Sequence, residues 1–219
     1  MLLYHGTAER FLPSILREGL RPRGLKKGNW KHSIESNSRA VYLTDAYVLH
    51  FAVNATRGKE RCLILEINTN KLNPFRFAPD EDFLEQATRK DPNYAHLPKE
   101  MKPRTRWFRR RALTEFAHVW EKSLEFMGTC TYYGLIPPEA ITRYVLIPQD
   151  HPVNFASDPT ICLMNYAILK TYYRKLVKFA FGEDPQVQPD DPDHYMRRLA
   201  TLPRDGLELN TVVHWEKSQ

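Results

Sequence analysis

The sequence predicts a protein of the α+β class, and three observations carry that prediction. Short apolar segments typical of strands alternate irregularly with amphipathic segments typical of helices. The segment 61–67 is apolar almost throughout, as in a central strand. A chain of 219 residues with 42% hydrophobic content is long enough for one sizeable core, alone or with an appendage.

The first third of the chain is expected to contain alternating strands and helices. The predicted elements are strands at 2–5, 40–44 and 61–67 and helices at 7–18 and 46–56. Thr7 is predicted to cap the first helix, and Thr44 or Asp45 to cap the second. The segment 21–39 is polar and has no period, which predicts a long loop of the kind that often binds ligands.

The rest of the chain is predicted to be richer in helix. The predicted elements are a loop at 91–106, a helix at about 105–127, strands at 129–135 and 143–147, a helix at 160–181 and an edge strand at 212–215. The composition changes near residue 150. We therefore predict a domain over 1–150 and a mainly helical extension over 151–219 packed on it.

Charge and cysteine content narrow the classes of protein and site. The net charge of +6 is compatible with a polyanionic partner without establishing one. Cys62, Cys130 and Cys162 have neither metal-ligand spacing nor an even number for disulfides, which predicts buried free thiols and a cytoplasmic protein. The histidines form no metal-binding pair, and no apolar run is long enough to span a membrane, so we expect neither a metal nor a membrane partner.

Three segments form an ordered set near the start of the chain. They are Tyr4-His5-Gly6-Thr7, then Ile15 to Leu20, then Val41-Tyr42-Leu43-Thr44-Asp45. Together they resemble the first half of the ADP-ribosyltransferase pattern, in the diphtheria-toxin-like branch that includes poly-ADP-ribose polymerases, DarT-type toxins and tRNA 2′-phosphotransferases. The resemblance covers roughly residues 1–67 well, 105–148 loosely and the last seventy not at all. It implies a split, mixed or antiparallel sheet with flanking helices.

The resemblance also implies roles for individual residues in binding NAD as a substrate. His5 is expected to bond the adenosine ribose, and the Gly6 backbone to receive the nicotinamide carboxamide with support from Thr7. Tyr42 is expected to stack on the nicotinamide, since an aromatic face suits a pyridinium and a glycine permits close approach. Arg39, just before that strand, is a weaker candidate for a phosphate contact.

The catalytic acid is the point at which the sequence departs from the family pattern. Many members carry a glutamate on a late strand, and Thr129 stands at about that place here. Glu125 lies one helical turn earlier, and the acidic group 80–82 is a further candidate. With His5 and Tyr42, Glu125 and Thr129 complete the predicted catalytic set.

The segment 99–111 combines many Lys and Arg residues with two aromatic ones. Cations at a helix N-terminus oppose the macrodipole, so we interpret the arginines there as phosphate contacts beside a stacking aromatic. The candidate nucleic-acid residues are Lys102, Arg104, Arg106, Trp107, Arg109 and Arg110. The alternative is a solvated face whose Trp107 and Phe108 pack into the core.

The functional hypothesis is an NAD-dependent ADP-ribosyltransferase, a glycosyltransferase that transfers ADP-ribose to a macromolecular acceptor. DNA and RNA are candidate acceptors, and a toxin or phage-conflict role would fit. Two alternatives stay open. One is RNA 2′-phosphotransferase-like chemistry, which the missing acid and the arginines favour. The other is a catalytically silent module that binds a nucleotide or nucleic acid on the same fold.

Overall fold

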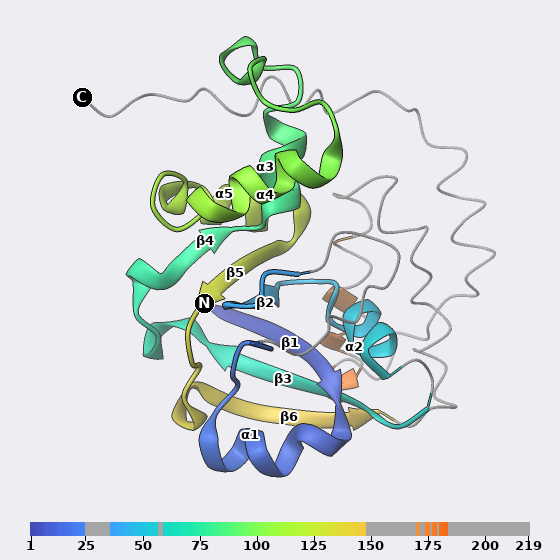
Figure 1. Ribbon diagram of the computed structural model, residues 1–219. Helices are drawn as coiled ribbons and strands as arrows, with labels where there is room; N and C mark the ends of the chain where they lie inside the picture. The colour runs from blue at the N-terminus through green and yellow to red at the C-terminus, as the bar shows by residue number, and fades with distance from the viewer. Residues whose placement is uncertain are drawn as a thin grey trace, which may run out of the picture.

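The fold is built on one six-stranded sheet, seen here in a computed structural model. The structure describes residues 1–24, 36–56, 59–147, 170, 174–175, 177–178 and 180–183. The strands are β1 (Leu2–Ala8), β2 (Ala40–Thr44), β3 (Cys62–Asn68), β4 (Phe77–Pro79), β5 (Thr129–Tyr133) and β6 (Ile141–Ile147). They lie in the order β4-β5-β2-β1-β3-β6 (Figure 1), and every pairing is antiparallel. The α+β class is therefore confirmed, with an antiparallel rather than a mixed sheet.

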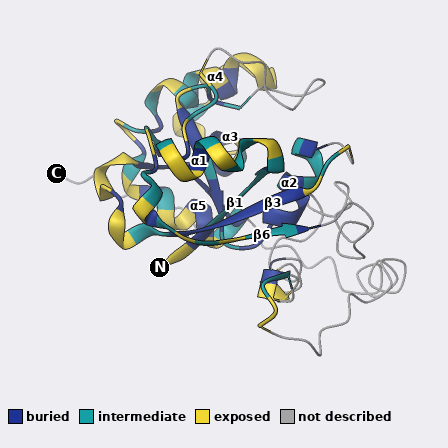
Figure 2. Ribbon diagram, turned by 90° about the horizontal axis from the view of Figure 1, so that it is seen from below, coloured by how far each residue is buried: buried dark blue, intermediate teal, exposed yellow. Residues whose placement is uncertain are grey.

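Between residues 1 and 147, the described ranges contain five α-helices that pack around this sheet. They are α1 (Leu12–Glu18), α2 (Val48–Thr56), α3 (Glu81–Ala87), α4 (Met101–Arg111) and α5 (Trp120–Met127). Helix α2 shares one apolar cluster with β3, and α1 packs in another cluster with β1, β2 and β3. Helices α3, α4 and α5 gather at the β4 end of the sheet (Figure 1). Strand β3 is buried along almost its whole length, whereas β1 is mostly half-buried, with Leu3 and Ala8 fully buried (Figure 2).

The prediction that Thr7 caps a helix is wrong. Thr7 lies inside β1, opposite Leu63, and β1 stays paired with β3 as far as Ala8. A short 3-10 turn follows, and α1 begins only at Leu12, where Pro13 occupies the first turn. The segment Tyr4 to Thr7 is thus strand throughout, whereas the sequence predicts a strand that ends at His5 and a helix cap at Thr7. The Thr44 hydroxyl accepts hydrogen bonds from the backbone amides of Ala46 and Tyr47, so Thr44 holds the turn that leads into α2, and the helix itself begins at Val48 rather than Ala46.

The single helix predicted at 105–127 is two helices. After Arg111 the chain turns, and the Arg111 carbonyl accepts bonds from three successive amides, the last of them Phe116. Phe116 then packs against Phe108 with ring centroids 5.8 Å apart, which holds the turn between the two helices against α4. The loop predicted at 91–106 is also wrong in its second half, because Pro103 sits in the first turn of α4, where a proline costs no helical hydrogen bond.

Residues of the C-terminal extension pack against the sheet domain. Lys170 is buried, and its ammonium donates to the carbonyls of Leu124 at 2.5 Å and Glu125 at 2.9 Å and pairs with Asp45 at 3.1 Å. Val177 belongs to the apolar cluster of α2. The Lys170 ammonium thus satisfies two backbone carbonyls in the last turn of α5. The residues described between 170 and 180 are helical, as predicted. The predicted strand at 212–215 lies outside the described residues.

Two further predictions concern thiols and membranes. Cys62 and Cys130 are free and buried, as expected, and Cys162 lies outside the described residues. None of the helices in the described ranges is long and apolar enough to cross a bilayer.

Candidate functional site

The candidate site begins where β1 and β2 part. Tyr4 opposite Thr44 is the one register pair between the described parts of these strands, whereas β1 pairs with β3 along its whole length. Beyond that pair, the His5 Nδ1 atom lies 2.9 Å from the Tyr42 carbonyl oxygen. A side chain thus takes the place of a backbone ladder bond. The sequence-predicted pair His5 and Tyr42 is joined directly, through the Tyr42 backbone.

This contact fixes the state of the His5 ring. A carbonyl only accepts, so Nδ1 must carry the proton and donate. Burial lowers the pKa of His5 below its ordinary value, and the bond to Tyr42 offsets that shift in part. The neutral ring therefore leaves Nε2 as a hydrogen-bond acceptor, which suits a hydroxyl group of a ligand.

We expect the lowered His5 pKa to appear in the pH dependence of stability. Below about pH 6.5 the unfolded chain binds a proton at this position that the folded chain resists, so His5 makes stability fall as pH falls. His5→Asn keeps a donor for Tyr42 without a titrating group. The free energy of unfolding of wild type, measured with urea, should exceed that of this variant at pH 7.5, and the difference should become smaller at pH 5. Parallel curves would contradict the assignment.

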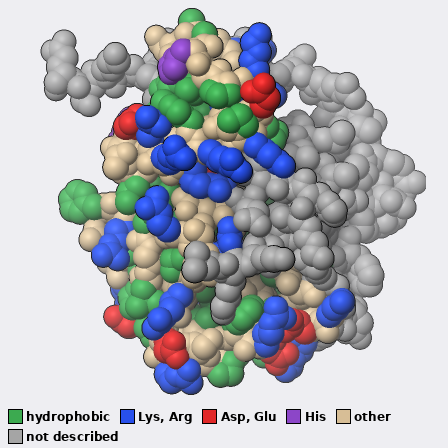
Figure 3. Space-filling view, in the orientation of Figure 1, with side chains coloured by type: hydrophobic (Ala, Val, Ile, Leu, Met, Phe, Trp, Pro, Cys, Tyr) green, Lys and Arg blue, Asp and Glu red, His purple; other side chains and the backbone are tan. Residues whose placement is uncertain are grey.

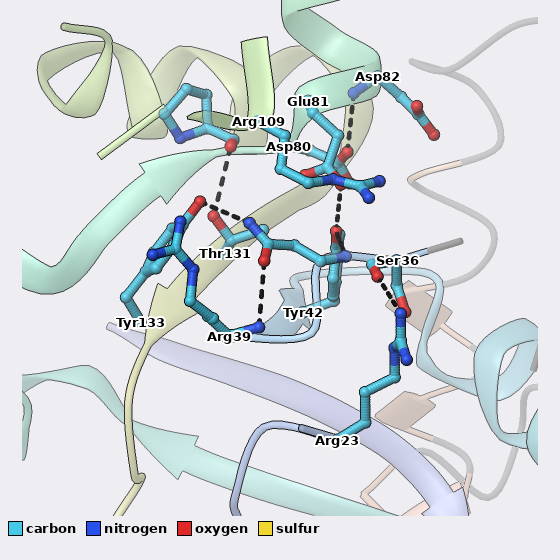
Figure 4. A network of polar contacts seen from close by, with 12 residues as sticks. Arg23, Ser36, Arg39, Tyr42, Asp80, Glu81, Asp82, Arg109, Thr131 and Tyr133 are labelled. Atoms are coloured by element: carbon cyan, nitrogen blue, oxygen red, sulfur yellow. Dashed lines mark hydrogen bonds and ion pairs between the residues drawn. The ribbon is translucent and has the colours of Figure 1, made fainter. Parts of the chain in front are cut away.

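The Tyr42 hydroxyl is the centre of a polar network (Figure 4). It donates to Glu81 Oε1 at 2.5 Å and accepts from the Asn37 amide at 2.6 Å. Burial raises the pKa of Tyr42 well above its ordinary value, and the nearby Glu81 and Asp80 carboxylates raise it further. The phenol therefore stays protonated and holds a fixed orientation between the loop before β2 and the start of α3.

Glu81 is the carboxylate that the structure adds to this site. It is the first residue of α3 and only 3% exposed. The Arg109 guanidinium of α4 approaches its Oε1 atom at 2.9 Å. Its other oxygen, Oε2, is buried and has no hydrogen-bond partner among the described residues. A buried carboxylate oxygen without a donor is costly, so this atom would gain from a hydrogen-bond donor, but a bound molecule reaches it only if the side chains that cover it move.

Asp80 and Thr129 lie behind Glu81. Asp80 caps α3 by accepting from the Asp82 amide at 3.0 Å, and its own amide donates to Ser123. Burial raises the pKa of Asp80 well above its ordinary value, as do the charges of Asp82 and Glu81, while the Thr129 hydroxyl lowers it. The acidic segment after β4 therefore reaches the position on β5 where the family pattern implies a glutamate.

A second aromatic residue extends the network toward the surface. The Asn37 side chain bridges two groups: its Nδ2 atom donates to the Tyr133 hydroxyl at 2.9 Å, and its Oδ1 atom accepts from the Arg39 backbone amide at 3.1 Å. Burial, followed by the Glu81 charge, raises the pKa of Tyr133 to about 12, and Arg39 and Arg109 oppose the shift. Arg39 is exposed beside this phenol (Figure 4), so it remains free to meet an anion.

The other predicted site residues do not join this network. Helix α2 packs so closely on Gly6 that no side chain fits there, because an added Cβ would lie 2.4 Å from the Val48 carbonyl oxygen. Gly6 therefore has a packing role that the sequence did not reveal. Thr7 follows it in β1, and Glu125 is exposed on α5. Thr129 is buried on β5, opposite Thr44.

The predicted nucleic-acid segment divides into internal and exposed residues. Arg104 is buried and donates to the Thr88 carbonyl at 2.8 Å, so the prediction that it contacts nucleic acid is wrong. Arg109 bonds Glu81, and Trp107 packs under Arg111. The exposed residues are Lys102, Arg106 and Arg110, which lie four apart along one face of α4.

The interpretation of the arginines as unfavourable cations at a helix N-terminus is also wrong, because α4 begins at Met101 and not at about residue 105. Arg109, Arg110 and Arg111 form its last turn, not its first. Cations there are favoured by the helix dipole, so local stability accounts for them.

The sequence predicts Glu81 only as a member of the acidic group 80–82, although it also contains a signal for the position of this residue. Asp80 followed by two acids and then Phe83 is the pattern of a capped helix start with an acidic first turn. The residue after the cap is thereby fixed on a rigid element. In the described ranges, no group of three or more His, Cys, Asp or Glu side chains is placed to hold a metal ion.

Comparisons of the chain with protein-family models, with curated proteins and with solved structures returned no match.

Proposed function

We propose that the protein is an NAD-dependent ADP-ribosyltransferase-like enzyme that uses the His5–Tyr42–Glu81 constellation. The observation that carries the proposal is the position of Glu81. A carboxylate with one unpartnered buried oxygen is hydrogen-bonded to the tyrosine that the sequence resemblance assigns to the nicotinamide. That tyrosine is joined through its backbone to the histidine assigned to a ribose.

The residue types suit the chemistry of NAD cleavage. The reaction breaks the bond between C1′ of the nicotinamide ribose and the pyridinium nitrogen, and nicotinamide leaves with the bonding electrons. The resulting oxocarbenium-like state is cationic, so an adjacent carboxylate stabilises it. In this proposal Glu81 takes that role and accepts the proton of the attacking acceptor group, which forms the new bond to C1′.

The remaining residues hold the site in shape. Arg109 keeps Glu81 oriented, and Asn37 holds the Tyr42 hydroxyl. His5 offers Nε2 to a ribose hydroxyl, and Arg39 is an exposed cation near the network for a phosphate. The acceptor belongs to the same proposal only as a class: a macromolecule with a nucleophilic group.

The test is incubation of the full chain with NAD labelled in the adenylate part, alone and with single-stranded DNA, RNA or protein. Released nicotinamide and transferred label are measured together. We expect slow release without acceptor and faster transfer with the right one, and we expect His5→Ala to reduce both. Neither release nor transfer with any acceptor overturns the proposal.

Two other outcomes would assign a different function on the same fold. Consumption of NAD only in the presence of a 2′-phosphorylated RNA would identify phosphotransferase chemistry. Calorimetric binding of NAD without turnover would identify a binding module.

A further inference from the structure

The turn before β4 presents the most exposed large hydrophobic residue of the described chain. Phe75 is 86% exposed, whereas the next in rank, Met1, is 57% exposed. From this residue and two neighbouring arginines, we propose that the β4–β5 end of the sheet binds single-stranded nucleic acid. Phe75 would stack on a base, and Arg76 and Arg39 would contact phosphates. The inference deepens the proposed function, on which its role as an acceptor surface rests.

The Phe75 side chain is held outward by a rigid turn. The Asn73 side chain accepts from the Phe75 amide at 3.0 Å, and its carbonyl accepts from the Arg76 amide at 3.1 Å. Pro74 fixes the backbone between them, and the turn leads directly into buried Phe77. An exposed ring on an ordered turn loses little conformational entropy when it stacks on a ligand.

Arg76 connects this ring to the candidate site. Its guanidinium lies over Gly134, where an added Cβ would meet Nη1 at 2.6 Å. Gly134 follows Tyr133, the phenol beside Arg39 at the edge of the Tyr42 network. The end of the sheet thus presents, in order, the exposed ring of Phe75, the guanidinium of Arg76, and Arg39 at the edge of the Tyr42 network.

Within the described residues, Arg39 and Arg76 resemble Arg106 and Arg110 of α4 in having no acidic partner, and they differ in this from Arg109 and Arg111. Arg39 and Arg76 are both exposed and form no salt bridge within the described ranges, whereas Arg109 pairs with Glu81 and Arg111 with Glu115. Figure 3 shows Lys and Arg side chains gathered across the middle of this face, below α3–α5, with few acidic ones among them. The net charge of +6 favours the same polyanionic partner.

Stacking selects single strands over other polyanions. Every base has a π-face, but in a duplex both faces are covered by neighbouring bases, so only an unpaired base can meet Phe75. Arginine supplies the planar contacts that suit phosphate oxygens. An acidic peptide would meet the arginines without using the ring.

The test measures fluorescence anisotropy of a labelled single-stranded oligonucleotide of about 12 nucleotides, as DNA and as RNA, with the full chain. We expect Phe75→Ala to weaken binding about tenfold or more. Arg76→Gln should weaken binding and flatten its salt dependence. Arg106→Gln tests the face of α4 that the sequence predicts to contact nucleic acid, and it should cost less affinity than Arg76→Gln. Matched controls are Tyr144→Ala, which removes an exposed aromatic of β6, and Arg17→Gln on α1. Both should bind as wild type does, and the duplex should bind more weakly.

Several results would overturn the inference: no binding by wild type, equal affinity of the Phe75 variant, a larger loss with Arg106→Gln, or heparin binding that matches the oligonucleotide. Release of nicotinamide without acceptor should be unchanged in Phe75→Ala. If wild type binds through Phe75 but never consumes NAD, the proposed function fails and this surface stands. If NAD is consumed and Phe75→Ala binds normally, the surface fails alone.

Discussion

Glu81→Gln is expected to reduce nicotinamide release by about 10²-fold or more while leaving the fold intact. The amide is close in shape to the carboxylate and still accepts from Tyr42 and Arg109, so the network keeps its geometry. It lacks the charge that stabilises an oxocarbenium-like state and cannot take a proton from the acceptor. Release is measured by chromatography under saturating NAD, and NAD affinity by calorimetry.

The matched control is Glu125→Gln, which makes the same chemical change at the acid that the sequence placed nearest the late strand. Glu125 is exposed on α5, and only its backbone carbonyl is used, by Lys170. This variant should release nicotinamide as wild type does. If it loses activity and Glu81→Gln does not, the catalytic acid has been assigned to the wrong element.

Gly6→Ala is expected to destabilise the protein by about 3 kcal/mol or more. The new methyl group would lie 2.4 Å from the Val48 carbonyl oxygen and 2.7 Å from the Ala52 amide nitrogen. Both are backbone atoms of α2, so no change of side-chain rotamer relieves the contact. Instead, the helix must move away from β1. Urea unfolding followed by circular dichroism measures the loss.

Gly24→Ala provides the control for backbone strain. Gly24 has φ +60°, but an added Cβ meets nothing within 4 Å, so only the left-handed conformation is penalised. We expect a loss of about 1 kcal/mol there. A Gly6→Ala protein as stable as wild type would show that α2 is free to shift, and Gly6 would then be open to a ligand.

Local sequence patterns predict where the strands of this chain lie better than they predict which strands are neighbours in the sheet. The apolar run that forms β3 and the segment of β2 were identified, because each carries its own period and burial signal. Their order was not, since the pairing of β2 with β5 on one side and β1 on the other depends on contacts between distant segments. Helix α4 was misplaced because Pro103 is a breaker in most positions and harmless in a first turn.

The dependence on contacts between distant segments also explains why the sequence predicts His5 and Tyr42 of the candidate site but not the position of Glu81. His5 and Tyr42 stand in a recognisable order along the chain, so the sequence paired them. Glu81 reaches Tyr42 through two pairings: Ala78 lies opposite Thr131, and Thr131 lies opposite Tyr42. No pattern within one segment reveals that route. Buried Arg104 was likewise indistinguishable from its exposed neighbours until the packing of α4 on α3 was known.

The contacts of the C-terminal extension bear on how this chain can be divided. Val177 fills part of the cluster around α2, Phe181 lies beside Tyr4 with centroids 5.9 Å apart, and Lys170 pairs with Asp45. A boundary at residue 150 would therefore cut through a shared core rather than between two modules. Fusion, domain exchange or limited proteolysis near that boundary should not release a self-sufficient sheet domain, because residues beyond β6 complete the core that the described strands begin.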